Sequence, residues 1–127
     1  MKISTATSVF INYPIQEAAK EILGAGYDGI DLWCGRPHLY RRDHSPEELR
    51  SLLLWLEESR LTPVSCMPAF FRYPYSLSSS REVVRQDSIA YMRETIDIAN
   101  VLSASSVLVV PTHSLYGQTV QDARAWF

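Results

Sequence analysis

Two loop segments of this sequence concentrate side chains that suit the binding of a small polar ligand. Residues 33–38 bring together an indole, a thiol, a guanidinium and an imidazole, and residues 111–116 include His113. Trp33 could form an apolar wall, while Arg36 and His38 could donate hydrogen bonds. A turn with solvated charges explains residues 33–38 equally well, and an ordinary polar loop position is the commoner explanation of a lone His such as His113.

Asp31 is a further candidate, because it lies inside an apolar stretch that predicts a strand. Ile30 and Leu32 alternate with it, so Asp31 and Trp33 share one face of that strand. If the apolar pair packs on helices, Asp31 points toward the interior of the fold, where a carboxylate needs hydrogen-bond partners. A structural acceptor is slightly favoured over a substrate contact.

The spacing of the remaining reactive residues indicates neither a metal site nor a disulfide. Cys34 and Cys66 form no CxxC pair, and no His, Asp or Glu cluster has ligand spacing. The sequence lacks GxGxxG, P-loop, HExxH and GxSxG patterns, and no two carboxylates are placed as an acid and base pair. With no secretion signal, free thiols in a reducing cytoplasm are expected.

Composition excludes two classes of partner. The net charge of −2 offers no basic surface for a nucleic acid, and no apolar run approaches the ~20 residues that span a bilayer. Hydrophobic residues make up 46% of the chain and charged residues 20%, which is typical of a soluble globular protein.

The elements that would position these residues alternate between strands and amphipathic helices. Strands are expected at residues 3–7, 28–33, 64–67 and 106–110, and helices begin near Pro14, Ser45, Ser79 and Thr119. Ser45 and Glu48 form a capping box, and a second is expected between Ser79 and Glu82. The third helix is expected to bury Val84, Ile89, Met92, Ile96 and Ala99.

Such alternation predicts parallel βα units, with functional loops at the carboxyl ends of the strands. A complete (β/α)8 barrel typically needs about 250 residues, so the 127 residues fit its N-terminal half. We therefore expect one partial domain, residues 1–127, with four strands in the order 1-2-3-4, helices on one face, and an end inside the fourth helix. A small doubly wound domain is the alternative fold.

Residues 26–33, Gly-Tyr-Asp-Gly-Ile-Asp-Leu-Trp, are followed by Gly-Arg-Pro-His at residues 35–38. This pattern resembles the xylose-isomerase-like TIM-barrel family of sugar isomerases and epimerases, and its sugar 3-epimerases most closely. The first stretch is shared across the family, whereas the second is more specific. Asp31 departs from the family's usual Glu, and Cys34 replaces a small residue.

The resemblance implies metal-dependent epimerisation at C3 of a ketose such as fructoselysine or its epimer psicoselysine, through an enediolate. It implies a divalent ion (Mn, Co, Mg or Zn) held by later strands, so neither catalytic residues nor metal ligands are expected in this chain. Alone, the chain is expected to be inactive. The residues expected to contact the sugar or sugar-amine substrate are Asp31, Trp33, Arg36, His38, Cys66 and His113.

Two other functions stay open. One is an apurinic endonuclease-like zinc hydrolase of the same superfamily, although Ala69 stands after Pro68 where that group has a metal-binding His. The other is a non-catalytic half-barrel. In either case the two open edges of a four-stranded sheet predict self-association or a homo-oligomer.

Overall fold

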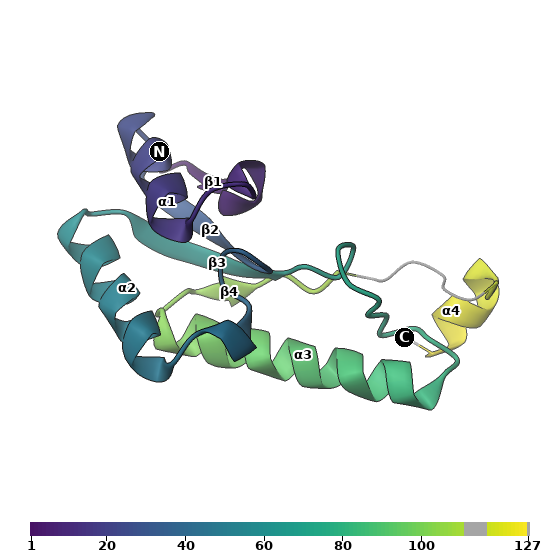
Figure 1. The fold of residues 1–127 in the computed structure, drawn as a ribbon. Helices are drawn as coiled ribbons and strands as arrows, with labels where there is room; N and C mark the ends of the chain where they lie inside the picture. Colours follow the sequence, from purple (N-terminus) through teal and green to yellow (C-terminus); the bar gives the residue numbers. More distant parts are fainter. Residues whose placement is uncertain (111–116, 127) are drawn as a thin grey trace.

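The computed structural model describes residues 1–110 and 117–126, in which strands and helices alternate as predicted (Figure 1). The elements are β1 (Ser4–Ala6), η1 (Thr7–Phe10), α1 (Ile15–Gly24), β2 (Gly29–Cys34), η2 (Arg41–Asp43), α2 (Pro46–Glu58), β3 (Thr62–Pro68), α3 (Glu82–Val101), β4 (Ser106–Val107) and α4 (Val120–Trp126), where η marks a 3-10 turn. Among the helices in these two ranges, none combines the length and apolar character needed to cross a bilayer.

The four strands form one parallel sheet in the order β1-β2-β3-β4. Buried side chains of α1, α2 and α3 share a single core with those of β2 and β3, so these helices cover the same face of the sheet. This topology confirms the predicted half of a (β/α)8 barrel. It excludes the doubly wound fold, which would need a different strand order and helices on both faces.

Alternation along β2 assigns the two faces of the sheet. Ile30 and Leu32 are fully buried in the helix-covered core, and burial of each contributes roughly 1.5–3 kcal/mol. The Asp31 carboxylate turns to the opposite face, where it meets hydroxyl groups from both neighbouring strands. We call this opposite surface the inner face, because it corresponds to the interior of a barrel.

Helices α2 and α4 begin as the sequence predicts. Ser45 Oγ accepts a hydrogen bond from the Glu48 N–H at 3.2 Å, and Glu48 Oε2 accepts one from the Ser45 N–H at 2.7 Å. Pro46 occupies the first turn, where no N–H donor is needed. Thr119 and Asp122 exchange the same pair of bonds before α4, each at 3.1 Å.

The start of α3 differs from the prediction. The helix begins at Glu82 after Arg81, and no side chain caps it. Ser79 Oγ instead accepts a hydrogen bond from the Arg81 N–H at 3.2 Å, which closes a local turn in place of a capping box.

The buried stripe of α3 is also more polar than predicted. It consists of Ser88, Tyr91, Met92, Thr95, Ile98 and Ala99. Ser88 Oγ donates to the Val84 carbonyl at 2.6 Å and Thr95 Oγ1 to the Tyr91 carbonyl at 3.0 Å, so neither buried hydroxyl lacks a partner. Ile96, which was expected inside, is 51% exposed.

Strand β4 is shorter than expected because its partner contains a proline. Ser106 and Val107 pair with β3, and the Leu108 N–H donates to the Cys66 carbonyl at 2.9 Å. In this register the next bond would need a donor from Pro68, which has no N–H. The ladder between the two strands therefore ends there.

Candidate functional site

A carboxylate with two hydroxyl partners lies on the inner face. Asp31 Oδ2 accepts a hydrogen bond from Ser4 Oγ at 2.7 Å, and Asp31 Oδ1 accepts one from Ser65 Oγ at 2.6 Å. The two serines belong to β1 and β3, on either side of β2. These charge-assisted bonds offset part of the cost of desolvating the carboxylate, which is the structural role favoured from the sequence.

A groove of about 480 Å³ hollows the inner face beside this carboxylate. Its lining consists of Ala6, Asp31, Val64, Ser65, Met67, Ser106, Val107 and Leu108. One carboxylate and two serine hydroxyls set in apolar walls can orient a small polar molecule. Asp31, proposed from the sequence, therefore lies where a ligand can reach it.

Sequence reasoning missed Ser65 and Met67, which flank Cys66 on β3. Strand pairing aligns Ser65 with Asp31 and Met67 with Trp33, and it includes a register shift just before Asp31. The available signal was alternation, since Ser65 and Met67 must occupy the face that Cys66 does not. The register shift could not be read from the sequence pattern.

Cys66 does not reach the groove, so the prediction that it faces a substrate is wrong. It pairs with Leu32 and is fully buried with Cys34 in the helix-covered core. Both thiols are free. Hydrogen bonding to Cys66 and burial raise the pKa of the Cys34 thiol, which keeps it protonated and unreactive.

Trp33 lies at the carboxyl end of β2 but is covered, with 6% of its surface exposed. Its backbone N–H donates to Thr7 Oγ1 at 2.9 Å, and its ring meets the His38 ring edge-on, with centroids 5.7 Å apart. Gly35 is required beside it, because a Cβ at that position would come within 2.7 Å of the indole ring. Trp33 thus supports the end of the strand.

Arg36 is the exposed cation of the loop after β2. Its Nε and Nη2 donate to Asp43 at 2.5 and 2.7 Å, its guanidinium lies 4.3 Å from the Tyr40 ring centroid, and its backbone N–H donates to the Tyr73 hydroxyl at 3.0 Å. Bonding to Asp43 raises the pKa of Arg36, and the same contact lowers the pKa of Asp43. A fixed, exposed guanidinium at this end of the sheet can still meet a ligand.

His38 is fully buried and hydrogen-bonded within the protein, which contradicts its predicted role as a donor to substrate. Its Nε2 lies 3.2 Å from the Phe10 carbonyl oxygen and 3.0 Å from that of Tyr13, so Nε2 carries the proton and donates. Its Nδ1 then accepts from Thr7 Oγ1 at 3.1 Å. Burial lowers the pKa of His38, which favours this neutral form.

Tyr91 joins the carboxyl ends of β2 and β3 and was not anticipated. Its hydroxyl donates to the Cys34 carbonyl oxygen and accepts a hydrogen bond from the Ala69 N–H at 3.0 Å. Its ring stacks on Tyr75 with centroids 4.6 Å apart, and burial raises its pKa. These two hydrogen bonds hold the loop after β2 and the loop after β3 at a fixed spacing.

The sequence also led us to expect that His113 contacts the substrate and that later strands hold a divalent ion. His113 lies outside the described residues. Within residues 1–110 and 117–126 there is no group of three or more His, Cys, Asp or Glu side chains that could hold a metal ion. The described residues therefore supply no site for the divalent ion, whose ligands the resemblance places on later strands.

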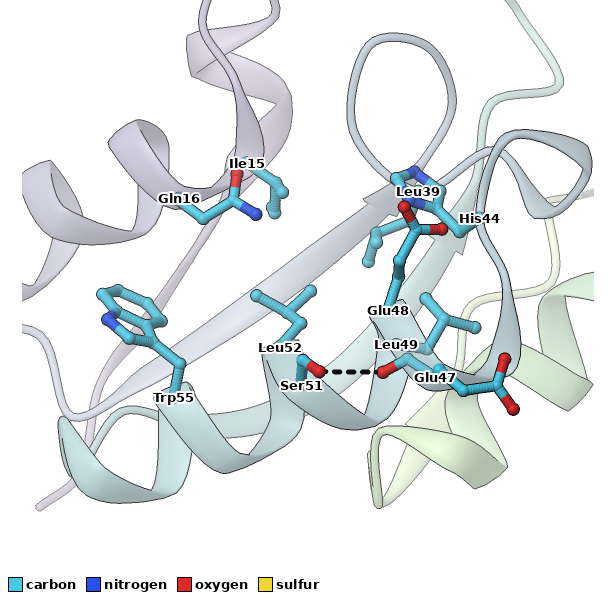
Figure 2. A pocket seen from close by; sticks show the side chains of 10 residues that line it. All are labelled: Ile15, Gln16, Leu39, His44, Glu47, Glu48, Leu49, Ser51, Leu52 and Trp55. Atoms are coloured by element: carbon cyan, nitrogen blue, oxygen red, sulfur yellow. Dashed lines mark hydrogen bonds between the residues drawn. The ribbon is translucent and has the colours of Figure 1, made fainter.

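A second groove, of about 520 Å³, lies on the helix side of the sheet (Figure 2). Residues of α1 and α2 form most of it, including Ile15, Leu52 and Trp55, and Glu47 and Glu48 come from the first turn of α2. It is separated from Asp31 by the sheet. Its titratable groups already have partners within the protein: Glu48 accepts a hydrogen bond from the Ser45 N–H, and His44 Nε2 lies 2.5 Å from the His38 carbonyl oxygen. We therefore keep the inner face as the candidate site.

Two curated proteins similar in sequence to this chain are enzymes of the same name. Fructoselysine 3-epimerase of Shigella flexneri is 27% identical over 116 residues, and that of Escherichia coli O157:H7 is 26% identical over the same length. Each match covers 91% of this chain and 42% of the relative. The chain thus spans less than half the length of the curated relatives it matches.

A solved structure and a family profile agree with these matches. The crystal structure of D-psicose 3-epimerase in the presence of D-fructose superposes with a TM-score of 0.74 at 16% identity, over 99% of this chain and 44% of the epimerase. At that identity the likeness establishes the fold alone. The profile of the family described as xylose isomerase-like TIM barrel matches residues 17–127, and the chain belongs to that family.

Proposed function

We propose that this chain forms the first four strands of a sugar epimerase that inverts C3 of a ketose of the fructoselysine or psicoselysine type. The observation that carries the proposal is the match of 116 residues to two fructoselysine 3-epimerases. The groove beside Asp31 supports it, because its hydroxyl groups and carboxylate suit a polyhydroxylated ligand.

In this proposal the described residues hold the substrate and do not move its protons. Inversion at C3 requires one group that removes a proton and another that returns one from the opposite side. Asp31 is the carboxylate that lines the groove, and both of its oxygens already accept hydrogen bonds from serines. We therefore assign proton transfer to residues beyond these four strands and expect the chain alone to be inactive.

We assign the expected metal dependence to residues beyond these four strands as well. A divalent ion would be supplied with ligands by the later strands, since the described residues hold no such group. For this chain we propose Asp31 as the substrate contact in the groove and Arg36 as an exposed contact at the rim. Trp33 supports the loop that carries Arg36.

The test is a chimera in which this chain replaces the corresponding N-terminal part of a fructoselysine 3-epimerase. With manganese or cobalt in deuterated water, the chimera should convert fructoselysine to its C3 epimer, as followed by NMR. This chain alone and the remaining part of the relative alone should not. A folded chimera without conversion would contradict the proposal.

Two matched variants of the chimera locate the site. Asp31→Asn should lower kcat/KM at least about tenfold, equivalent to about 1.4 kcal/mol of transition-state stabilisation. Asp28→Asn is the control, because Asp28 Oδ2 accepts from the Ile3 N–H before β1 and lies outside the groove. Equal losses in the two variants would remove Asp31 from the site.

A further inference from the structure

The loop after β2 carries an ion pair whose position is fixed by several contacts. Arg36 Nε and Nη2 donate to Asp43 at 2.5 and 2.7 Å, although 56% of the Arg36 side chain and 35% of the Asp43 side chain are exposed. The guanidinium lies 4.3 Å from the Tyr40 ring centroid, and the Arg36 N–H donates to the Tyr73 hydroxyl at 3.0 Å. Exposed ion pairs add little to stability, so stabilising the fold is a weak explanation for this arrangement.

The aromatic support of Arg36 is buried within the described part of the chain. Tyr40 is 6% exposed, and its ring packs against that of Tyr91 with centroids 5.8 Å apart. Its hydroxyl lies 3.2 Å from the Tyr75 hydroxyl. A guanidinium that rests on a fixed ring loses little conformational freedom when a ligand binds, which favours a binding role.

The ion pair uses only part of the hydrogen-bonding capacity of its two groups. A guanidinium has five N–H donors, and Asp43 accepts from one on Nε and one on Nη2. The three that remain include a parallel pair on Nη1 and Nη2, which matches the two oxygens of a carboxylate. Each Asp43 oxygen accepts one bond from Arg36 and has a further lone pair for a donor such as an ammonium.

Arg36 and Asp43 follow the strand end that borders the groove on the inner face. Trp33, near the end of β2, pairs in register with Met67, and Met67 lines the groove together with Asp31. In a (β/α)8 barrel the loops at the carboxyl ends of the strands surround the mouth of the site. The ion pair is therefore placed to meet the part of a ligand that extends out of the groove.

The charges of the pair indicate what kind of group would bind. A simple anion at Arg36 would also face the Asp43 carboxylate, which repels it. A group with an ammonium beside its carboxylate avoids this repulsion, because the ammonium donates to Asp43 while the carboxylate accepts from Arg36. The contact with Arg36 lowers the pKa of Asp43, so Asp43 remains ionised at neutral pH.

The lysine part of fructoselysine is a group of this kind. In that molecule C1 of the sugar is bonded to the side-chain nitrogen of lysine, so the α-carboxylate and the α-ammonium remain free at the end of a flexible four-carbon stem. We propose that Arg36 and Asp43 form a subsite that binds these two groups while the sugar occupies the groove. This inference rests on the proposed function and adds which part of the substrate the rim recognises.

Four conjugates of fructose that differ only at the far end of the stem test the subsite in the epimerase chimera. Their amines are lysine, 6-aminohexanoate, which lacks the α-ammonium, cadaverine, which lacks the α-carboxylate, and pentylamine, which lacks both. Isothermal titration calorimetry without added metal measures the Kd of each conjugate. The lysine conjugate should bind at least about tenfold more tightly than the pentylamine conjugate, with the other two between them.

Two variants of the chimera assign this preference to Arg36. Arg36→Gln should weaken binding of the lysine and 6-aminohexanoate conjugates about tenfold, without weakening that of the cadaverine and pentylamine conjugates. Arg36→Lys keeps the charge but loses the parallel donors, so it should restore only part of the affinity. Arg50→Gln is the matched control, because Arg50 is 63% exposed and pairs with Glu47 within α2, and it should change no Kd.

Binding and conversion are measured separately, so the subsite and the proposed function can fail independently. A chimera that converts fructoselysine but binds all four conjugates equally would overturn the subsite and leave the proposed function intact. A chimera without conversion contradicts the proposed function, while the graded order of Kd values would still support the subsite and equal values would overturn it.

A merely structural role of Arg36 gives a different result. Equal weakening of all four conjugates by Arg36→Gln, with circular dichroism retained, would show that Arg36 only supports the loop, and would overturn the inference. If Arg36→Gln does not fold, the same comparison with Arg36→Lys decides, and Kd values that this change leaves unaltered would also overturn it.

Discussion

The Tyr91 hydroxyl shows how a single side chain can organise the candidate site from a distance. It is fully buried, and it bridges a carbonyl at the end of β2 and an N–H just after β3. The loop that carries Arg36 follows the first of these ends, and the loop that carries Tyr73 follows the second. Because both backbone groups are buried, they depend on this hydroxyl for a partner.

Replacing Tyr91 by Phe should therefore destabilise the chain by about 1–3 kcal/mol, since the ring is kept but two backbone groups lose their partner. Urea denaturation followed by circular dichroism measures the change. Tyr13→Phe is the matched control, because Tyr13 is 53% exposed. A loss of stability no larger than that of the control would show that the bridge contributes nothing.

His38 makes stability depend on pH in a direction that its burial determines. Its folded-state pKa is lowered, so the unfolded chain binds a proton more readily than the folded chain. The contribution is fully present above the unfolded pKa of about 6.5 and is lost as the pH falls toward the lower folded value.

We expect the free energy of unfolding to decrease as the pH is lowered below about 6.5, because protonation of His38 would break its acceptor bond at Nδ1. His38→Gln should be less stable at neutral pH but should lose less stability over the same acidic range. Chemical denaturation at a series of pH values measures both. Parallel pH profiles for the two chains would mean that other groups cause the dependence.

At the scale of elements, the capping box of α2 is a local device that the sequence specified completely. Ser45 and Glu48 satisfy each other's backbone donors at the start of the helix. Ser45→Ala should cost about 1 kcal/mol of stability. Ser51→Ala is the matched control, since Ser51 bonds back to the Glu47 carbonyl inside the same helix and its loss should be near neutral. Thermal melting distinguishes them, and equal effects would refute the assignment.

Much of the fold followed from patterns that act over a few residues. Alternation at Ile30, Asp31 and Leu32 assigned the two faces of β2, and the strand order followed from parallel βα units. These features depend on sequence neighbours and on chain handedness, both of which the sequence shows directly.

The parts that could not be predicted depend on partners distant in sequence. His38 is buried because groups of Thr7, Phe10 and Tyr13, 25 to 31 residues earlier, surround its ring. The face of Cys66 depends on the register between β2 and β3, which shifts just before Asp31. On α3, buried positions filled by serine and threonine hid the true stripe from a pattern based on apolar residues.

At the scale of the whole molecule, the described part of the candidate site lies on the inner face of one four-stranded sheet. The chain covers 42% of the length of the fructoselysine 3-epimerases, and its described inner face has one carboxylate beside hydroxyl groups and apolar side chains. In the proposed function, this surface binds one side of the sugar. The chemistry on that sugar would come from strands that these residues do not include.

Because we assign the metal ligands to residues beyond these four strands, we can predict how the chain responds to metal ions. A ligand that binds only the folded state raises stability by RT ln(1 + [L]/Kd), so a tightly bound ion would raise the melting temperature markedly. No described group of His, Cys, Asp or Glu can hold such an ion. Millimolar manganese or cobalt should therefore leave the melting temperature of the 127-residue chain unchanged, whereas the epimerase chimera should be stabilised. A rise that grows with metal concentration in the isolated chain, and that a chelator reverses, would place a metal site within these four strands and move part of the proposed chemistry into them.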